Sequence, residues 1–277
     1  MMWALTGLLV RSLAPVLGSV KINAVRSGLS GLLLLGWVVL AGKGADLASI
    51  SVTSLALLTL SIVAAIGIGD TVFFESARLL GLARAMTVSM TYPLLAALMA
   101  AGLFGDALTP RLALGSLLTL GGLVLIVGWR AETDDEGRRW LGIGAATLAS
   151  VAWAASVVLM KPPLAEIEPV TAQAIRLPLA AALLATTPWA RGTTAAMRNG
   201  GRPVLVRVAV LSILTAFSSV MFVAGLKYAG VTVASVLSST APMFAIPLGF
   251  FFLDERLTLR AVMGTAVTVV GVIVMQL

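Results

Sequence analysis

The sequence contains neither cysteine nor histidine among its 277 residues. These absences exclude disulfide bonds and thiolate chemistry, most zinc sites and any histidine proton relay. Charged residues are also scarce, at 11% of the chain, whereas a soluble domain carries about 25%. The sequence therefore predicts neither a soluble globular protein nor an enzyme built on these groups, and it indicates no cofactor.

Hydrophobic residues make up 59% of the chain, and the mean hydropathy is +1.05. A soluble fold of this length cannot bury so much apolar surface, so we expect the lipid bilayer to cover it. The formal net charge is +7, but most basic residues stand at the ends of apolar runs, where Lys and Arg anchor membrane helices. The predicted partner is thus lipid, and not nucleic acid.

Long apolar runs recur along the whole chain, and a helix needs about 20 such residues to cross a bilayer. Nine runs reach this length, and a shorter fragment precedes them at 1–13. The breaks between the runs are too short to hold a soluble domain. The nine predicted spans are 17–41, 50–75, 84–104, 111–129, 141–160, 169–189, 204–226, 232–252 and 258–277.

The two halves of the chain repeat each other. A shift of 149 residues aligns, without a gap, Arg78 with Lys227, Ser89 with Ser238, Thr91 with Thr240, Pro93 with Pro242, Asp106 with Glu255, Gly115 with Gly264 and Gly122 with Gly271. A shift of 150 aligns Trp3 with Trp153 and Arg26 with Arg176. Similar apolar composition does not explain matches at proline, glycine and charged positions. We therefore predict two five-helix repeats, at 1–130 and 140–277.

Because five is an odd number, the second repeat must cross the membrane upside down relative to the first. Inverted repeats are typical of secondary transporters, whose substrate site lies near the midplane between the repeats. The predicted fold class is an all-α integral membrane protein, a ten-helix bundle. Its first helix is expected to be truncated, since the counterpart at 141 begins about ten residues earlier in the repeat.

Several short motifs occur in a characteristic order. They are Trp3 with Arg11 eight positions on, the intramembrane Arg26, the segment Gly69-Asp70-x-x-x-Phe74-x-x-Ala77-Arg78-x-x-Gly81, Tyr92-Pro93, and an acidic-x-Leu-Thr turn before the last helix of each half. With the duplication, they make the whole chain resemble the EamA-type branch of the drug/metabolite transporter superfamily. The resemblance implies two EamA-like halves in the bacterial inner membrane. It also implies transport of amino acids or other small metabolites, often outward.

Charged residues inside apolar spans are candidate functional residues, because charge within a bilayer is expensive. Arg26 and Arg176 can bind an anionic group such as a substrate carboxylate, which the planar guanidinium contacts bidentately. Alternatively, they pair with carbonyls at helix ends or reach the membrane interface. Asp70 can carry a proton in coupled transport, since burial favours the protonated acid, or it can pair with Arg26 and serve packing.

Proline and aromatic residues within the spans are further candidates. Pro93 and Pro242 each remove a helix hydrogen bond, which predicts either a hinge or a fixed bend. Trp3 and Trp153 line the substrate cavity or belong to the interfacial aromatic belt.

Small and hydroxyl-bearing residues complete the set. Thr91, Tyr92, Ser238 and Thr240 line the cavity or form hydrogen bonds between helices. Glycines seven residues apart, at 115 and 122 and at 264 and 271, are predicted to let two helices approach closely.

No cluster of catalytic residue types exists, so an intramembrane enzyme is disfavoured, as is a sensor without a soluble output domain. The leading prediction is a secondary transporter that exports amino-acid-like or other carboxylate-bearing metabolites by alternating access. The alternative is an uncoupled channel or facilitator of the same architecture. Orientation is open, because basic residues favour cytoplasmic odd-numbered loops whereas the resemblance implies cytoplasmic termini.

Overall fold

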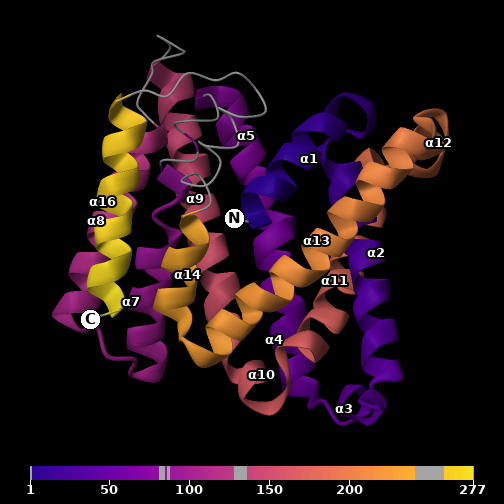
Figure 1. The fold of residues 1–277 in the computed structure, drawn as a ribbon, viewed down its shortest axis with the longest axis horizontal. Helices are drawn as coiled ribbons and strands as arrows, with labels where there is room; N and C mark the ends of the chain where they lie inside the picture. Colours follow the sequence, from indigo (N-terminus) through magenta and orange to yellow (C-terminus); the bar gives the residue numbers. More distant parts are fainter. Residues whose placement is uncertain (1, 81–84, 86–87, 128–135, 241–258, 277) are drawn as a thin grey trace. The chain divides into compact units, whose positions relative to one another are not determined.

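A computed structural model describes residues 2–80, 85, 88–127, 136–240 and 259–276 (Figure 1). Within these residues every regular element is a helix, which confirms the prediction of an all-α fold. Pro242 lies outside the described residues. The main helices are α1 (Met2–Leu17), α2 (Ser19–Leu40), α4 (Val52–Ile62), η1 (Val63–Asp70), α5 (Thr71–Leu80), α7 (Tyr92–Phe104), α8 (Pro110–Val127), α9 (Glu136–Leu159), α11 (Pro169–Ala185), α13 (Gly201–Tyr228), α14 (Val231–Ser239) and α16 (Leu259–Gln276).

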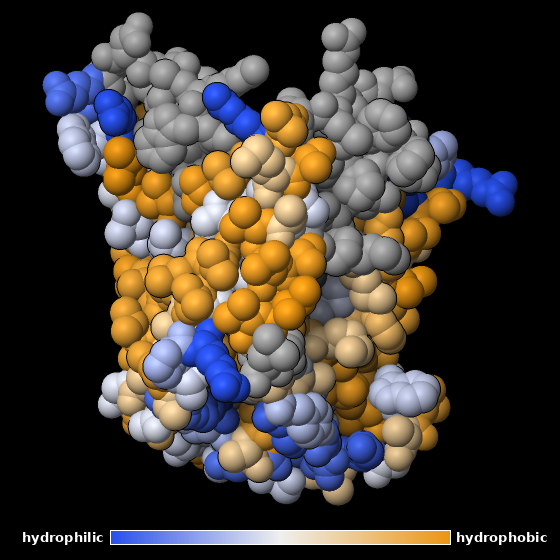
Figure 2. Space-filling model, turned by 60° about the vertical axis from the view of Figure 1, so that its left-hand side comes forward, coloured by the Kyte–Doolittle hydropathy of each residue, from blue (hydrophilic) through white to orange (hydrophobic). Residues whose placement is uncertain are grey.

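Several helices have the length and composition of membrane spans. Four stretches qualify individually, at Val20–Leu40, Val52–Phe73, Arg139–Glu166 and Gly201–Tyr228. The bent pair Pro169–Ala185 and Pro188–Asn199 qualifies as a fifth if it is one span. Hydrophobic residues cover much of the surface seen in Figure 2, with hydrophilic residues gathered toward its upper and lower margins. The chain is therefore a multi-pass membrane protein, while the count of ten spans stays a prediction.

Three of the breaks between the predicted spans contain short helices, which the sequence analysis did not predict. These are α3 (Gly44–Ala48), α10 (Lys161–Glu166) and α12 (Thr193–Asn199). In α10, the prolines at 162 and 163 stand in the first turn. Backbone N–H groups in the first turn have no partner within the helix, so the missing N–H of proline costs no hydrogen bond there. Prolines, which interrupt a helix when they lie in its interior, therefore lie at the start of a helix here.

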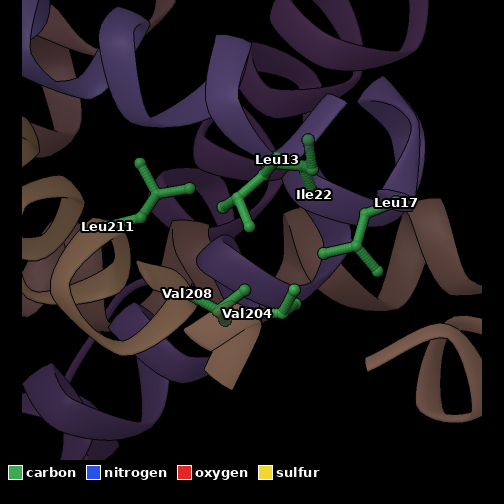
Figure 3. Packing of buried hydrophobic residues seen from close by; sticks show 6 residues of the cluster. All are labelled: Leu13, Leu17, Ile22, Val204, Val208 and Leu211. Atoms are coloured by element: carbon green, nitrogen blue, oxygen red, sulfur yellow. The ribbon is translucent and has the colours of Figure 1, made fainter. Parts of the chain in front are cut away.

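The chain divides into two compact units, and each unit takes segments from both sequence repeats. Unit 1 comprises Ala64–Val158 and Tyr228–Leu277, and unit 2 comprises Met2–Val63 and Leu159–Lys227. Contacts between the two repeats therefore occur inside each unit. In unit 2, buried apolar side chains of α1, α2 and α13 point toward one another (Figure 3); they are Leu13, Leu17, Ile22, Val204, Val208 and Leu211.

Helices α2 and α11 of unit 2 pack at their small residues. A Cβ atom added to Gly31 would lie 2.6 Å from the ring of Pro178, and one added to Gly28 would lie 3.5 Å from Cβ of Ala181. A shift of 150 makes Gly28 equivalent to Pro178 and Gly31 equivalent to Ala181. Gly28 therefore contacts the equivalent of Gly31, and Gly31 contacts the equivalent of Gly28. Residue numbers increase along α2 while those of the contacted residues on α11 decrease, so the two helices are antiparallel.

Helices α8 and α16 of unit 1 repeat this arrangement. A Cβ atom on Gly122 would overlap Oγ1 of Thr268, and one on Gly271 would lie 2.5 Å from Oγ1 of Thr119. The shift of 149 makes Gly122 equivalent to Gly271 and Thr119 to Thr268, so these contacts are also reciprocal. The prediction of close packing at these glycines is confirmed for Gly122 and Gly271.

Replacing Gly122 with alanine is expected to destabilise the α8–α16 pair by about 1–3 kcal/mol, because the new methyl group overpacks the contact. The neighbouring Gly121 is the matched control, since a Cβ atom there meets nothing within 4 Å. Thermal melting of the detergent-solubilised protein measures the difference. Equal melting temperatures for the two alanine variants would contradict the observed packing.

Candidate functional site

Asp70 ends a π-helix within the apolar run 50–75. The π-helix η1 (Val63–Asp70) separates α4 from α5, and π-helical turns inside α-helices occur frequently at functional sites. The Asp70 side chain is half-buried. A carboxylate thus lies within a stretch that has the length and composition of a membrane span, where charge is expensive and usually functional.

Trp153 of α9 lies directly against this carboxylate. Its indole Nε1–H donates a hydrogen bond of 3.0 Å to Oδ1 of Asp70. The preceding Gly69 makes room for the indole, because a Cβ atom there would lie 2.5 Å from Cδ1 and 2.6 Å from Nε1 of Trp153. The glycine and the carboxylate therefore position the indole together, one by leaving space and the other by accepting its hydrogen.

Two more aromatic rings flank the indole. The ring centroid of Phe73, on α5, lies 5.2 Å from that of Trp153, and the ring of Tyr92, on α7, lies 6.1 Å away in an edge-to-face arrangement. The Tyr92 hydroxyl donates to the carbonyl oxygen of Ser235 (3.2 Å) and lies 2.5 Å from Oγ of Ser238. Helices α5, α7, α9 and α14 thus contribute to one cluster in unit 1.

A helix break stands beside this cluster. Met90 and Thr91 form a turn, and α7 begins at Tyr92 with Pro93 in its first turn. Oγ1 of Thr91 lies 2.9 Å from Oγ of the buried Ser150 on α9. The predicted interruption of this apolar run is therefore present, although it precedes Pro93, while motion about it remains a prediction.

The structure brings together four of the predicted site residues, Asp70, Trp153, Tyr92 and Ser238. Thr91 lies beside them in the chain, and its hydroxyl contacts Ser150. Thr240 instead donates to the carbonyl oxygen of Leu237 in its own chain segment, and the side chain of Trp3 lies outside the described part. Sequence reasoning missed Gly69, Phe73 and Ser150. The spacing of Phe73, three residues after Asp70 on the same helical face, was the available signal.

The two predicted arginines belong to unit 2. Arg176 of α11 is buried, at 6% exposure, and its Nη1 donates a 3.2 Å hydrogen bond to Oε1 of Gln173. Arg26 of α2 is half-buried. Each arginine precedes the antiparallel α2–α11 crossing by a similar number of residues, which separates the two by about 10 Å along the helices.

Comparison with known proteins places these observations in a family. The EamA-like transporter family matches residues 1–128 and 140–277. An uncharacterized transporter of Archaeoglobus fulgidus is 26% identical over 211 residues, which cover 76% of this chain and 72% of the relative. A solved crystal structure with 20% identity has a TM-score of 0.79 and covers 99% of this chain and 93% of its own, and this likeness shows the fold. The family and the relative's name point to a transporter rather than an enzyme.

Proposed function

Because this chain belongs to the EamA-like transporter family, we propose that it is a secondary transporter of small carboxylate-bearing metabolites, such as amino-acid-like compounds. It exports them across the bacterial inner membrane by alternating access. Two inverted five-helix repeats, at 1–130 and 140–277, supply the two alternately open states.

The reciprocal contacts of equivalent helices carry this proposal. Both α2 with α11 and α8 with α16 pack in an antiparallel register that maps each repeat onto the other. A two-fold axis perpendicular to the paired helices produces such contacts, whereas parallel repeats would place equivalent helices in parallel. This register supports an axis in the membrane plane, which is the symmetry of transporters built from inverted repeats.

The polar residues divide the tasks of transport between them. Arg176, with Arg26 as its equivalent, binds the substrate carboxylate. Asp70 carries the coupling proton, and its position in a membrane-length segment favours coupled transport over an uncoupled facilitator. The prolines at 93 and 242, which the repeat makes equivalent, serve as hinges.

Counterflow in proteoliposomes tests the proposal. Vesicles with the purified full chain are loaded with unlabelled amino acids or organic acids, and uptake of the labelled compound is followed with and without a pH gradient. We expect exchange of at least one carboxylate-bearing compound that the gradient accelerates. Exchange without an effect of the gradient would support the facilitator instead, and no exchange of any compound would reject transport.

Replacing Asp70 with asparagine is expected to remove the acceleration by the pH gradient, because the amide cannot bind and release the coupling proton. Some exchange should remain at high substrate concentration, because asparagine keeps the size of the side chain. Asp46→Asn, on the short helix α3, is the matched control and should respond to the gradient like the wild type. A gradient response that survives in Asp70→Asn would assign the proton to another residue.

A further inference from the structure

The charged residues of unit 2 are distributed unequally between its two ends. At the end that carries α3 and α10, positive and negative charges balance: the residues are Lys43, Asp46, Lys161, Glu166, Glu168 and Lys227. Lys227 forms an ion pair of 3.0 Å with Glu168. Glu166 accepts hydrogen bonds from the hydroxyls of Ser51 and Ser54. All three acidic residues of unit 2 therefore lie at this end.

The opposite end of unit 2 carries positive charge without any acidic residue of that unit. Figure 1 shows α12 at this end, away from α3 and α10. Arg191 and Arg198, before and within α12, are exposed, and Lys21 of α2 is half-buried. Within the described part of the chain, no ion pair includes any of these three cations. Their charge is therefore available to an anion from outside the protein.

Two of these cations come from segments that are distant in sequence but close in space. The 3₁₀-helix η2 (Pro188–Ala190) packs against α2. A Cβ atom on Gly192 would lie 3.9 Å from Nζ of Lys21, so the ammonium group lies beside the backbone that follows Arg191. Trp189 of η2 is 67% exposed. Exposed tryptophan is typical of the headgroup level of a bilayer, so these cations lie where lipid phosphates are found.

The direction of α12 agrees with this level. The segment Pro188–Asn199 is bent by 93° from α11. With α11 across the bilayer, as its sequence predicts, α12 runs along the membrane surface, as interfacial helices do. Ala196 and Met197 of α12 pack against the buried cluster of α1, α2 and α13. The short helix is thus held in this direction by its apolar side.

An exposed apolar face of α2 continues from Lys21 toward the membrane interior. Leu29 and Leu32 follow Lys21 by eight and eleven residues, which places the three on one side of the helix. Leu29 is 38% exposed and Leu32 is 65% exposed. Eleven residues of helix span about 16 Å, close to the thickness of one leaflet of the hydrocarbon core, about 15 Å. A ligand with a phosphate above an acyl chain matches this face along its length, whereas a free phosphate matches only its charged end.

We propose that Lys21 and Arg191 bind the phosphate of an anionic phospholipid, whose acyl chain lies along Leu29 and Leu32. Arg191 can contact two phosphate oxygens with its planar guanidinium, and Lys21 adds a compact charge. A zwitterionic phospholipid carries its own positive group, which offsets the attraction to the two cations. This lipid is a ligand distinct from the transported molecule, and its binding does not depend on the proposed function.

Native mass spectrometry of the full chain purified in detergent tests the inference. The probes are phosphatidylglycerol and phosphatidylcholine with identical acyl chains, and sn-glycerol 3-phosphate as a soluble competitor. The wild type is expected to bind phosphatidylglycerol about tenfold more tightly than phosphatidylcholine, because each basic residue near the headgroup contributes about a fivefold factor. A tenfold excess of glycerol 3-phosphate should not displace the lipid, because it lacks acyl chains.

The double variant Lys21→Gln, Arg191→Gln should lose this preference, and its melting temperature in detergent without lipid shows whether it is folded. Arg191→Gln alone, at an exposed position, should lower the preference about fivefold, which keeps the test decisive if the double variant does not fold. Exchanging the two cations, as Lys21→Arg with Arg191→Lys, should retain most of it. Lys43→Gln, just beyond the other end of α2, is the matched control and should bind like the wild type.

Three results would overturn the inference. They are equal binding of the two lipids by the wild type, an unchanged preference in Arg191→Gln, and an equal loss in Lys43→Gln. Displacement by glycerol 3-phosphate would also contradict it, since the ligand would then be a free phosphate and not a lipid. Because no substrate is present, these results are separate from counterflow, and a chain that binds the lipid but exchanges nothing contradicts the proposed function alone.

Discussion

Replacing Arg176 with alanine is expected to lower the counterflow rate at low substrate concentration about 100-fold for carboxylate-bearing substrates. Truncating one partner of a buried, hydrogen-bonded charge pair costs about 2–5 kcal/mol, and about 1.4 kcal/mol corresponds to a factor of ten. Arg176 is buried at 6% exposure, so water cannot replace it easily. Arg26→Ala should have a smaller effect, because Arg26 is only half-buried.

A matched substrate separates binding from a structural role of Arg176. The amide analogue of a transported acid lacks the negative charge, so the wild type should transport it poorly and Arg176→Ala should reduce that rate little further. This non-additivity is the signature of a direct pair. Arg202→Ala, at an exposed position of α13, controls for general loss of positive charge. If Arg176→Ala lowers transport of acid and amide by equal factors, Arg176 serves folding.

The helical fold could be predicted because its main signal is local. Apolar runs and glycines seven residues apart lie within single stretches of sequence, and the structure confirms the all-α class and the close packing at Gly122 and Gly271. The short helix α10 was not predicted because its prolines indicate a helix break. Proline in a first turn and proline in a helix interior look alike until the start of the helix is known.

The members of the site could be predicted one by one, but their grouping could not. Asp70 stood out as a charge within an apolar run, and Trp153 through its counterpart in the repeat. Their hydrogen bond joins residues 83 positions apart, and it depends on how α9 packs against the π-helix. The only signal for Phe73 was its spacing from Asp70, because a phenylalanine in an apolar run is also typical of a lipid-facing or packing residue.

Replacing Gly69 with alanine is expected to lower transport about 10- to 100-fold, although the change adds one methyl group and removes no polar atom. The new Cβ would lie 2.5 Å from Cδ1 of Trp153, so the indole must move away and the hydrogen bond to Asp70 must lengthen. A displacement of about 1 Å in a binding site can reduce activity about 100-fold. Initial rates of counterflow with and without a pH gradient measure the effect.

Gly67→Ala is the matched control for Gly69→Ala, because Gly67 is exposed and lies in the same π-helix. If alanine disturbs the π-helix itself, both variants lose transport to a similar degree. If the position of the indole matters, Gly69→Ala alone loses transport. The second result would show that the last two residues of the π-helix act together. Gly69 leaves space for the indole of Trp153, and Asp70 accepts its hydrogen bond.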